Sequence, residues 1–146
     1  MIKLSGKKWQ QMVKKVLLLI IFMLVSLLIV SCSVSQEPVV PPLYGDISDL
    51  AEEFIEYMRN EDYSSAVYFF NADMKKAMSE GKLKHSWEAL LTQQGAYEGE
   101  IDKHIEESDD YRAVNVITDF VAGPINIRVV FDGDNRVAGL WFQPVE

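Results

Sequence analysis

The chain has 146 residues, of which 49% are hydrophobic and 25% charged, and its formal net charge is −8. That length suits one domain and is too short for two separate hydrophobic cores. Five lysines and no acidic residue lie before residue 16, so the remainder holds nine basic and 22 acidic residues, a net charge of −13. Such an acidic surface repels phosphate backbones, and we therefore expect no nucleic-acid partner.

The N-terminal 31 residues have the pattern of a targeting segment. The lysines are followed by fifteen residues, Val16 to Val30, in which Ser26 is the only polar side chain. A basic region followed by an apolar run is typical of a signal peptide. A transmembrane helix needs about 20 apolar residues, so this run is short for a permanent span. We predict a signal helix within a signal peptide over residues 1–31, with an uncleaved N-terminal anchor as the alternative.

Cys32, the only cysteine of the chain, follows this run directly. Ile29, Val30, Ser31 and Cys32 resemble the lipobox of prokaryotic lipoproteins, in which a small residue precedes the cysteine at the cleavage site. The resemblance implies cleavage before Cys32 and a diacylglyceryl group on its thiol. The protein is then expected at the cell membrane, lipid-anchored on the extracytoplasmic face. A buried or incidental free thiol is the alternative, but no second cysteine is present to pair with it.

A tether is predicted behind this cysteine. The segment Ser33 to Pro42 contains three prolines and has neither a helical nor a strand period. An extended Pro-rich chain rises about 3.1 Å per residue, so it would hold the next domain about 30 Å from the bilayer. We divide the chain into a signal peptide (1–31), a lipidated cysteine with its Pro-rich tether (32–43) and a folded domain (44–146).

Three helices are predicted in the first half of the domain. The first has a capping box of Asp49 and Glu52 at its start. Its apolar stripe consists of Leu50, Phe54, Tyr57 and Met58. The second helix, over residues 63–78, is expected to stop at Gly81. Its stripe consists of Ala66, Phe69 or Phe70, Met74 and Met78. The third helix is closed by Gly95, and its stripe consists of Leu83, Trp87, Leu90 and Leu91.

Four strands are predicted in the second half, where the apolar period changes to two. The first alternates from Tyr97 to Glu106 and has one solvated acidic face, which includes Glu98, Glu100, Asp102, His104 and Glu106. The others run over residues 111–121, 125–131 and 137–144. In the last strand Gly139 suggests a bulge, and either Val137 and Trp141 or Leu140 and Phe142 could face inward. Helices followed by an antiparallel meander indicate an α+β domain.

The hydrophobic pattern also suggests a register for the central hairpin. If the turn lies between Gly123 and Pro124, Phe120 faces Ile127 and the apolar faces of both strands coincide. Asp119 is then expected directly opposite Arg128.

Three segments resemble a family of extracytoplasmic domains of unknown function, numbered 3887, which is placed in the nuclear transport factor 2-like superfamily. They read AEEFIEYMRNEDYSSAVYFFNADMKKAM, LKHSWEALLTQQGAY and VVFDGDNRVAGLWFQP. The shared residues are mostly packing residues, so the resemblance concerns the fold more than function. It implies three N-terminal helices packed on a curved four-stranded antiparallel sheet, the nuclear transport factor 2-like or cystatin-like cone.

No catalytic, metal or cofactor site is expected. His85, His104 and Asp119 could in principle form a base with its orienting partner. However, His104 is predicted on the solvated face of the first strand and His85 on the polar side of its helix. Two histidines without cysteine partners do not make a zinc site. The turn DGDN resembles part of a calcium loop, but Gln143 stands where the final glutamate is required.

Nine aromatic residues are expected in the core: Phe54, Tyr57, Phe69, Phe70, Trp87, Phe120, Phe131, Trp141 and Phe142. The expected function is a lipid-anchored module that binds a small apolar ligand or a protein partner. The alternative is a small secreted enzyme with an acid or base in a cone-shaped pocket. A buried Asp119 or His85 without an ion-pair partner would favour the enzyme, and an exposed apolar patch would favour binding.

Overall fold

The computed structural model describes residues 9–18, 40–109 and 111–145. Residues 9–18 form a helix in one unit of the chain, and the residues from 40 onward belong to the second unit, the domain. No helix among the described residues is both long and apolar enough to cross a membrane. The predicted lipidation site Cys32, the apolar run beyond residue 18 and the tether up to residue 39 lie outside the described residues.

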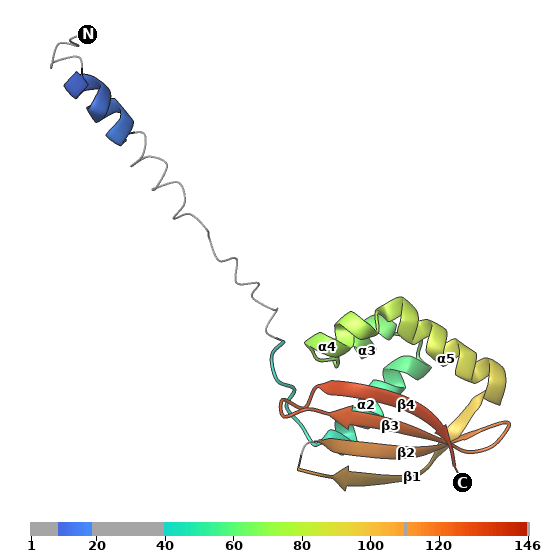
Figure 1. The fold of residues 1–146 in the computed structure, drawn as a ribbon. Coiled ribbons are helices and arrows are strands. Elements are labelled where there is room, and N and C mark those ends of the chain that lie inside the picture. Colours follow the sequence, from blue (N-terminus) through green and yellow to red (C-terminus); the bar gives the residue numbers. More distant parts are fainter. Residues whose placement is uncertain (1–8, 19–39, 110, 146) are drawn as a thin grey trace. The chain divides into compact units, whose positions relative to one another are not determined.

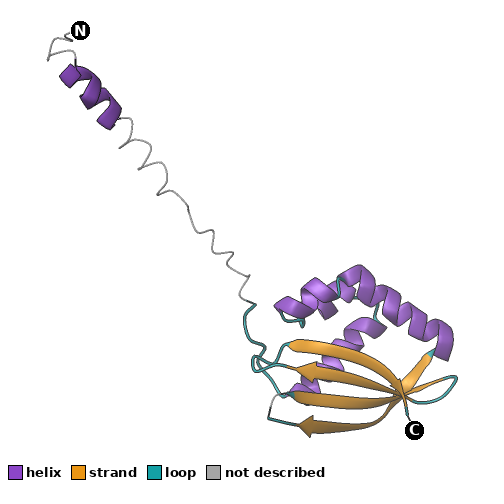
Figure 2. Ribbon diagram, viewed as in Figure 1, coloured by secondary structure: helices purple, strands orange, loops and turns teal. Residues whose placement is uncertain are grey.

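The domain is an α+β fold whose helices pack on one face of an open antiparallel sheet (Figures 1 and 2). Its helices are α2 (Ile47–Arg59), α3 (Tyr63–Tyr68), α4 (Ala72–Ala77) and α5 (Glu80–Gln94). Its strands are β1 (Tyr97–Glu107), β2 (Arg112–Phe120), β3 (Ile125–Phe131) and β4 (Val137–Pro144). They are neighbours in chain order, so the sheet is a meander. With the helix of residues 9–18 the described part contains five helices, and the prediction of three in the domain is wrong.

Helix α2 begins after Asp46, whose side chain accepts a hydrogen bond from the Ser48 amide (2.8 Å). The predicted capping box is wrong, because Asp49 lies inside the first turn, where a negative charge favours the helix dipole. The predicted apolar stripe is confirmed and packs into the core: Leu50, Phe54, Met58 and the half-buried Tyr57.

The second predicted helix is two short helices, α3 and α4. At the break, the Asn71 amide donates to the Val137 carbonyl (3.0 Å) and the Val137 amide donates to the Phe69 carbonyl (2.9 Å). Asn71 is also the N-cap of α4, and its side chain accepts from the Met74 amide (2.8 Å). Asparagine side chains compete for backbone donors, which favours caps over helix interiors. The chain therefore leaves the helix here to pair with the start of β4.

Helix α5 contains Gly81, so the predicted stop at that glycine is wrong: the helix begins at Glu80, after its N-cap Ser79. Its predicted end at Gly95 is confirmed. Gly95 has φ 82°, and a Cβ there would lie 2.7 Å from the Val121 side chain, so only glycine fits without strain. The buried residues of α5 belong to the predicted stripe: Leu83, Trp87 and Leu90.

The predicted register of the central hairpin is wrong. Val116 pairs with Ile127 and Asn115 with Arg128, so each β2 residue meets the β3 residue four positions earlier than predicted. The turn is closed by the Gly123 amide on the Phe120 carbonyl (2.8 Å), which centres it two residues before the predicted position. When the register shifts by an even number of residues, every side chain stays on the same face of the sheet. The hydrophobic pattern therefore cannot distinguish the two registers.

Strand β1 does not alternate strictly as predicted. Its pairing with β2 shifts twice, between Tyr97 and Gly99 and between Glu100 and Asp102. Glu100 therefore pairs with Thr118, on the helix side, and Ile101 is 57% exposed. Bulges of this kind bend an edge strand and interrupt its ladder.

The core lies between the helices and the inner face of the sheet. Its ring contacts include Trp87 with Phe120, whose centroids lie 6.1 Å apart. The predicted bulge is confirmed, since β4 shifts its pairing with β3 between Val137 and Gly139. Leu140 and Phe142 consequently face the helices. The prediction that Trp141 is a core residue is wrong: it faces away from the helices and is 49% exposed.

Residues 41–45 are held by the turn between β3 and β4. The Leu43 amide donates to the Asp134 carbonyl (2.9 Å), and Asn135 Nδ2 donates to the carbonyls of Leu43 and Gly45 (both 3.2 Å). Arg136 Nε donates to the Pro41 carbonyl (2.6 Å). The turn thus fixes the path by which the chain enters the domain.

Arg136 is the largest buried charged side chain of the domain, with 1% of its surface exposed. Its Nη1 donates to the Tyr68 carbonyl, and its guanidinium carbon lies 4.8 Å from the centroid of the Tyr68 ring. Among the described residues no carboxylate pairs with this guanidinium, and Nη2 has no hydrogen-bond partner. Its charge is therefore stabilised by carbonyl oxygens and a ring face.

Candidate binding site on the outer face of the sheet

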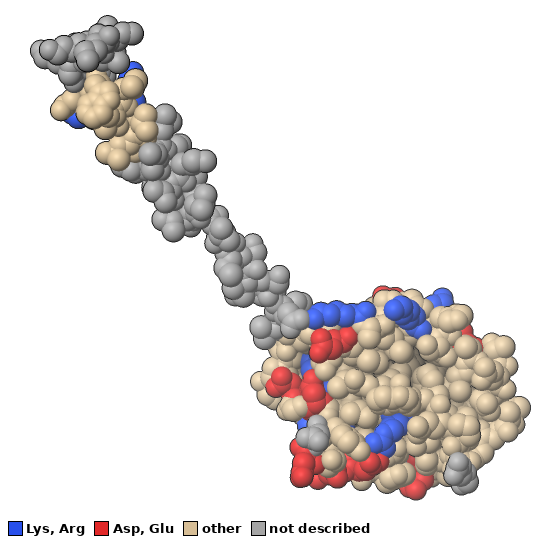
Figure 3. Space-filling view, in the orientation of Figure 1, with Lys and Arg blue, Asp and Glu red and all other residues tan. Residues whose placement is uncertain are grey.

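The face of the sheet away from the helices carries a pocket. We call it the outer-face pocket, and it is lined by Tyr111, Arg128, Val130, Trp141 and Gln143. Its volume is about 260 Å³, slightly below the range of about 300–1,000 Å³ that is typical of small-molecule pockets. The pocket therefore suits a ring-sized group. Figure 3 shows a largely uncharged surface over the strands, with acidic side chains gathered at the β1 edge.

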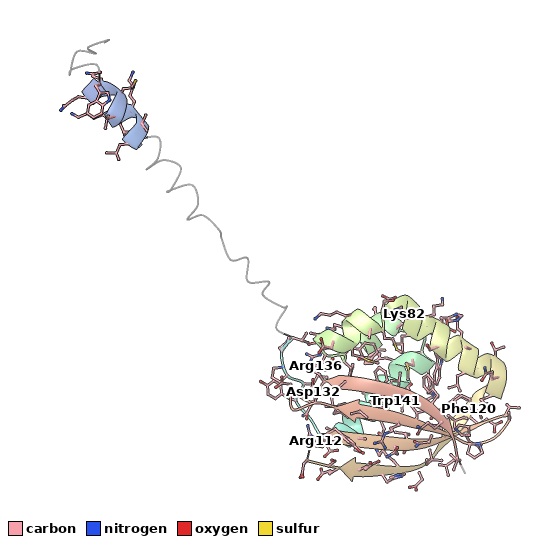
Figure 4. All side chains as sticks on the ribbon, in the orientation of Figure 1. Lys82, Arg112, Phe120, Asp132, Arg136 and Trp141 are labelled. Atoms are coloured by element: carbon pink, nitrogen blue, oxygen red, sulfur yellow. The ribbon has the colours of Figure 1, made fainter. Side chains whose placement is uncertain are left out.

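Trp141 forms one wall, and its position depends on Gly139. A Cβ built on Gly139 would lie 2.3 Å from Cη2 and 2.4 Å from Cζ3 of the indole. The ring therefore lies against the bare backbone of Gly139, two residues earlier on the same face of β4, and its other side faces solvent. Figure 4 shows Trp141 over the middle of the sheet.

Arg128 lies on β3 directly opposite Trp141, and it is fixed by hydrogen bonds. Its Nη1 donates to Glu106 on β1 and to Asn115 Oδ1 on β2 (3.2 Å). Its guanidinium carbon lies 5.7 Å from the centroid of the Tyr111 ring. The hydrogen bonds of this side chain to Glu106 and Asn115 both use Nη1, and Nε and Nη2 donate no hydrogen bond to the described residues.

Glu106 completes the network at the edge of the pocket. It accepts from Arg128 and from the Tyr111 hydroxyl (3.1 Å). The hydrogen bond from Arg128, followed by that from Tyr111, lowers the pKa of Glu106 to about 2. The same pair raises the pKa of Arg128. Both side chains are thus charged at neutral pH, and their charges compensate each other.

A buried amide acceptor lies beside this network. Asn126 Nδ2 donates to Asn115 Oδ1 (3.0 Å), whereas Asn126 Oδ1 is buried and has no partner among the described residues. Most buried polar atoms of native proteins are paired, so an orphan acceptor is uncommon. The unpaired oxygen of Asn126 adds a polar group next to Gln143, which is the cross-strand neighbour of Asn126.

A second cavity of about 420 Å³, the α2–β1 groove, lies between helix α2 and the start of β1. Its lining is mostly acidic, and several of these carboxylates already have partners on the protein. Glu56 pairs with Arg59 (2.5 Å), and Glu52 pairs with Lys103. Arg59 in turn covers the Tyr97 ring, with 4.5 Å from its guanidinium carbon to the centroid. Burial raises the pKa of Tyr97. These internal pairs make the groove a weaker candidate than the outer-face pocket.

The residues considered for catalysis are not brought together. His85 and His104 are exposed, Asp119 is half-buried, and no hydrogen bond among the described residues joins any two of them. No group of three or more potential metal ligands occurs in the described part of the chain. The Asp132 carboxylate instead closes its own turn by accepting from the amides of Asp134 (3.0 Å) and Arg136 (2.9 Å).

The sequence analysis missed the outer-face pocket. Its signal was the spacing of Gly139 and Trp141, because a glycine two residues from a tryptophan on a strand lets the ring lie on the backbone. Arg128 was expected to pair with Asp119, but the true register places Asn115 opposite Arg128, and Glu106 supplies the carboxylate. The acid therefore comes from β1, which is separated from the strand of Arg128 by β2.

Comparison with protein families identifies the domain. A family model described as "Protein of unknown function (DUF3887)" matches residues 51–140, more than half of the chain. No curated protein and no solved structure matches the chain. The matched range includes Arg128 and Val130 of the pocket and Gly139 beneath Trp141.

Proposed function

This chain belongs to the DUF3887 family, and we propose that it is a lipid-anchored extracytoplasmic binding module that uses the outer-face pocket. The lipid is attached at Cys32, behind the cleaved signal peptide, and the Pro-rich tether carries the domain. We further place the fold in the nuclear transport factor 2-like superfamily. Helices packed on one face of an antiparallel sheet support that placement.

The exposure of Trp141 carries the binding proposal. A tryptophan that is 49% exposed, beside a pocket and opposite an arginine, is a typical anchor of a binding site. Scattered surface apolar residues need no explanation, but this one is positioned by a glycine that a larger residue could not replace without moving the ring. The enzyme alternative lacks such support, because His85 and His104 are exposed and Asp119 is only half-buried.

The attachment is tested by the mass of the protein produced in its own host and released gently with detergent. We expect a mass short by residues 1–31 and heavier by a diacylglyceryl group. The Cys32→Ala variant should carry no lipid. A wild-type mass that retains residues 1–31 and has no lipid would contradict the attachment and identify the apolar run as an uncleaved anchor.

The binding site is tested by photo-crosslinking in intact cells. A photoreactive phenylalanine analogue replaces Trp141, and the control carries it at Tyr44, which is 89% exposed and does not line the pocket. We expect an adduct of defined mass from position 141 alone. Identical adducts from both positions, or none from position 141, would contradict the proposed site.

A further inference from the structure

The chemistry of the outer-face pocket indicates a class of ligand. Trp141 presents a flat, electron-rich ring face to solvent, held in place by Gly139. Such a face attracts the weakly positive C–H groups of another ring, and this favours stacking of a saturated or aromatic ring over a branched apolar chain. The Tyr111 ring, which is 37% exposed, lines the same pocket.

The polar groups of the pocket are suited to hydroxyl groups. Arg128 has donors on Nε and Nη2 in a planar fork, which can contact two neighbouring oxygens at once. Gln143 offers both a donor and an acceptor, and Glu106 has further acceptor capacity. Each hydroxyl of a ligand is itself a donor and an acceptor, so adjacent hydroxyls on one ring match this mixed set.

The charge around the pocket favours a neutral ligand. Glu106 compensates the charge of Arg128, and the chain outside its N-terminal lysines has a net charge of −13. This field repels polyanions, and the ion pair of Arg128 with Glu106 presents no net charge to a ligand. A neutral molecule that has a C–H ring face and vicinal hydroxyls meets all of these requirements.

We propose that the outer-face pocket binds a neutral saccharide, with one pyranose ring stacked on Trp141 and two adjacent hydroxyls on the fork of Arg128. This inference rests on the proposed function, since it names the ligand of that site. A pocket of about 260 Å³ accommodates a ring-sized part of such a chain. The remaining rings extend over the surface of the strands, which is largely uncharged (Figure 3).

The test uses the full chain in a detergent without a sugar headgroup. The probes are cellotriose, maltotriose and triacetylchitotriose, each titrated with saturation-transfer NMR. We expect at least one of them to bind, and Trp141→Ala to weaken that binding about tenfold, the loss of one aromatic ring contact. Trp141→Phe should retain part of the affinity, and Tyr44→Ala should retain all of it.

Two further measurements test the remaining parts of the inference. Arg128→Lys keeps the charge but loses the fork, so it should weaken binding while far-ultraviolet circular dichroism shows an unchanged fold. Trigalacturonic acid, an anionic probe of the same length, should bind more weakly than the best neutral trisaccharide.

Failure of this inference is distinguishable from failure of the proposed function. If none of the three neutral probes binds, or if Trp141→Ala binds as well as wild type, the saccharide inference is overturned. An anionic probe that binds more tightly than every neutral one also overturns it. A crosslink from position 141 to a protein, combined with no saccharide binding, would leave the proposed binding site intact and replace its ligand.

Discussion

The position of the Trp141 side chain depends on Gly139, because the indole ring occupies the space where a side chain on residue 139 would lie. The indole is on the solvent side of β4 and contributes nothing to the core between sheet and helices. Its fixed position is therefore best explained by a role at the surface. Glycine in a strand interior is otherwise slightly destabilising.

Gly139→Ala should displace the Trp141 ring with little loss of fold stability. The new methyl group would meet two ring carbons at 2.3 and 2.4 Å, so the side chain must rotate into solvent. Because the displaced ring can rotate into solvent rather than into the core, we expect a loss of only about 1 kcal/mol in the free energy of unfolding, the lower end of what overpacking costs. Fluorescence quenching by iodide should show a more accessible tryptophan than in wild type.

Gly133→Ala is the matched control for this experiment, since a Cβ on Gly133 meets nothing within 4 Å. It should leave the quenching unchanged. Equal quenching in Gly139→Ala and wild type would show that the ring does not depend on Gly139.

At the scale of elements, the break between α3 and α4 joins the helical layer to the sheet. Asn71 makes the break with three groups: its amide pairs with β4, its Oδ1 caps α4, and its Nδ2 donates to Asp132 Oδ2 (3.0 Å) in the β3–β4 turn. One residue thus connects two helices, a strand and a turn.

Asn71→Ala should lower the free energy of unfolding by about 1–2 kcal/mol, because α4 loses its cap. The loss of the bond to Asp132 adds to this effect. Urea unfolding monitored by circular dichroism measures it. Ser79→Ala is the control, since Ser79 is the N-cap of α5 but its side chain makes no capping hydrogen bond. Equal losses in the two variants would contradict a specific role of the Asn71 side chain.

The ion pair between Glu106 of β1 and Arg128 of β3 predicts a dependence of stability on pH. The folded-state pKa of Glu106 is about 2, below its ordinary value of 4.5. The stability that it contributes is therefore fully present above pH 4.5 and is lost as the pH falls towards 2. Between these values the unfolding midpoint should fall more steeply for wild type than for Glu106→Gln.

Glu98→Gln provides a control on the same strand, because Glu98 is exposed and makes no hydrogen bond or ion pair among the described residues. It should follow the wild-type curve. Parallel curves for wild type and Glu106→Gln, measured by urea unfolding at successive pH values, would show that the ion pair does not act in solution.

Sequence periodicity predicted the elements better than their pairing. The stripes of α2 and α5 follow from burial of one helix face, so residues such as Phe54 and Trp87 could be identified from spacing. The break at Asn71 could not, because it depends on hydrogen bonds to Val137, 66 residues later in the chain. The hairpin register failed for a similar reason. The Ala122 amide donates to the Gln94 carbonyl, at the end of α5, and the Val121 amide donates to the Ala96 carbonyl just beyond it, and alternation does not encode these contacts.

The candidate site was harder to predict from the sequence than the helices and strands were. An aromatic residue in a strand is normally assigned to the core, and only the bulge before Gly139 turns Trp141 outward. Arg128 was identified from its charge, but its carboxylate partner depended on the register of two strand pairs.

At the scale of the whole molecule, Arg136 connects the entering chain to the body of the domain. It donates to the Pro41 carbonyl on one side and to the Tyr68 carbonyl, at the end of α3, on the other. Lys75 also lies near the Tyr68 ring, with 5.9 Å from its Nζ to the centroid. Burial, followed by the charge of Arg136, lowers the pKa of Lys75.

Arg136→Met should release residues 41–45 and lower the free energy of unfolding by about 1–3 kcal/mol, since two carbonyls lose a charged donor. Limited proteolysis should cut this segment faster than in wild type. Lys75→Met is the control, because it removes a cation from the same ring without removing a hydrogen bond to Pro41. Equal cleavage of both variants would contradict the role of Arg136.

The hydrogen bonds between the β3–β4 turn and residues 41–45 determine how the domain responds to a pulling force. A force that pulls on residue 40 acts first on the hydrogen bonds of Leu43, Asn135 and Arg136. These bonds connect to two strands and to the end of α3, so the load is shared before α2 begins to unwind from Asp46. A domain held in this way resists peeling from its N-terminal end.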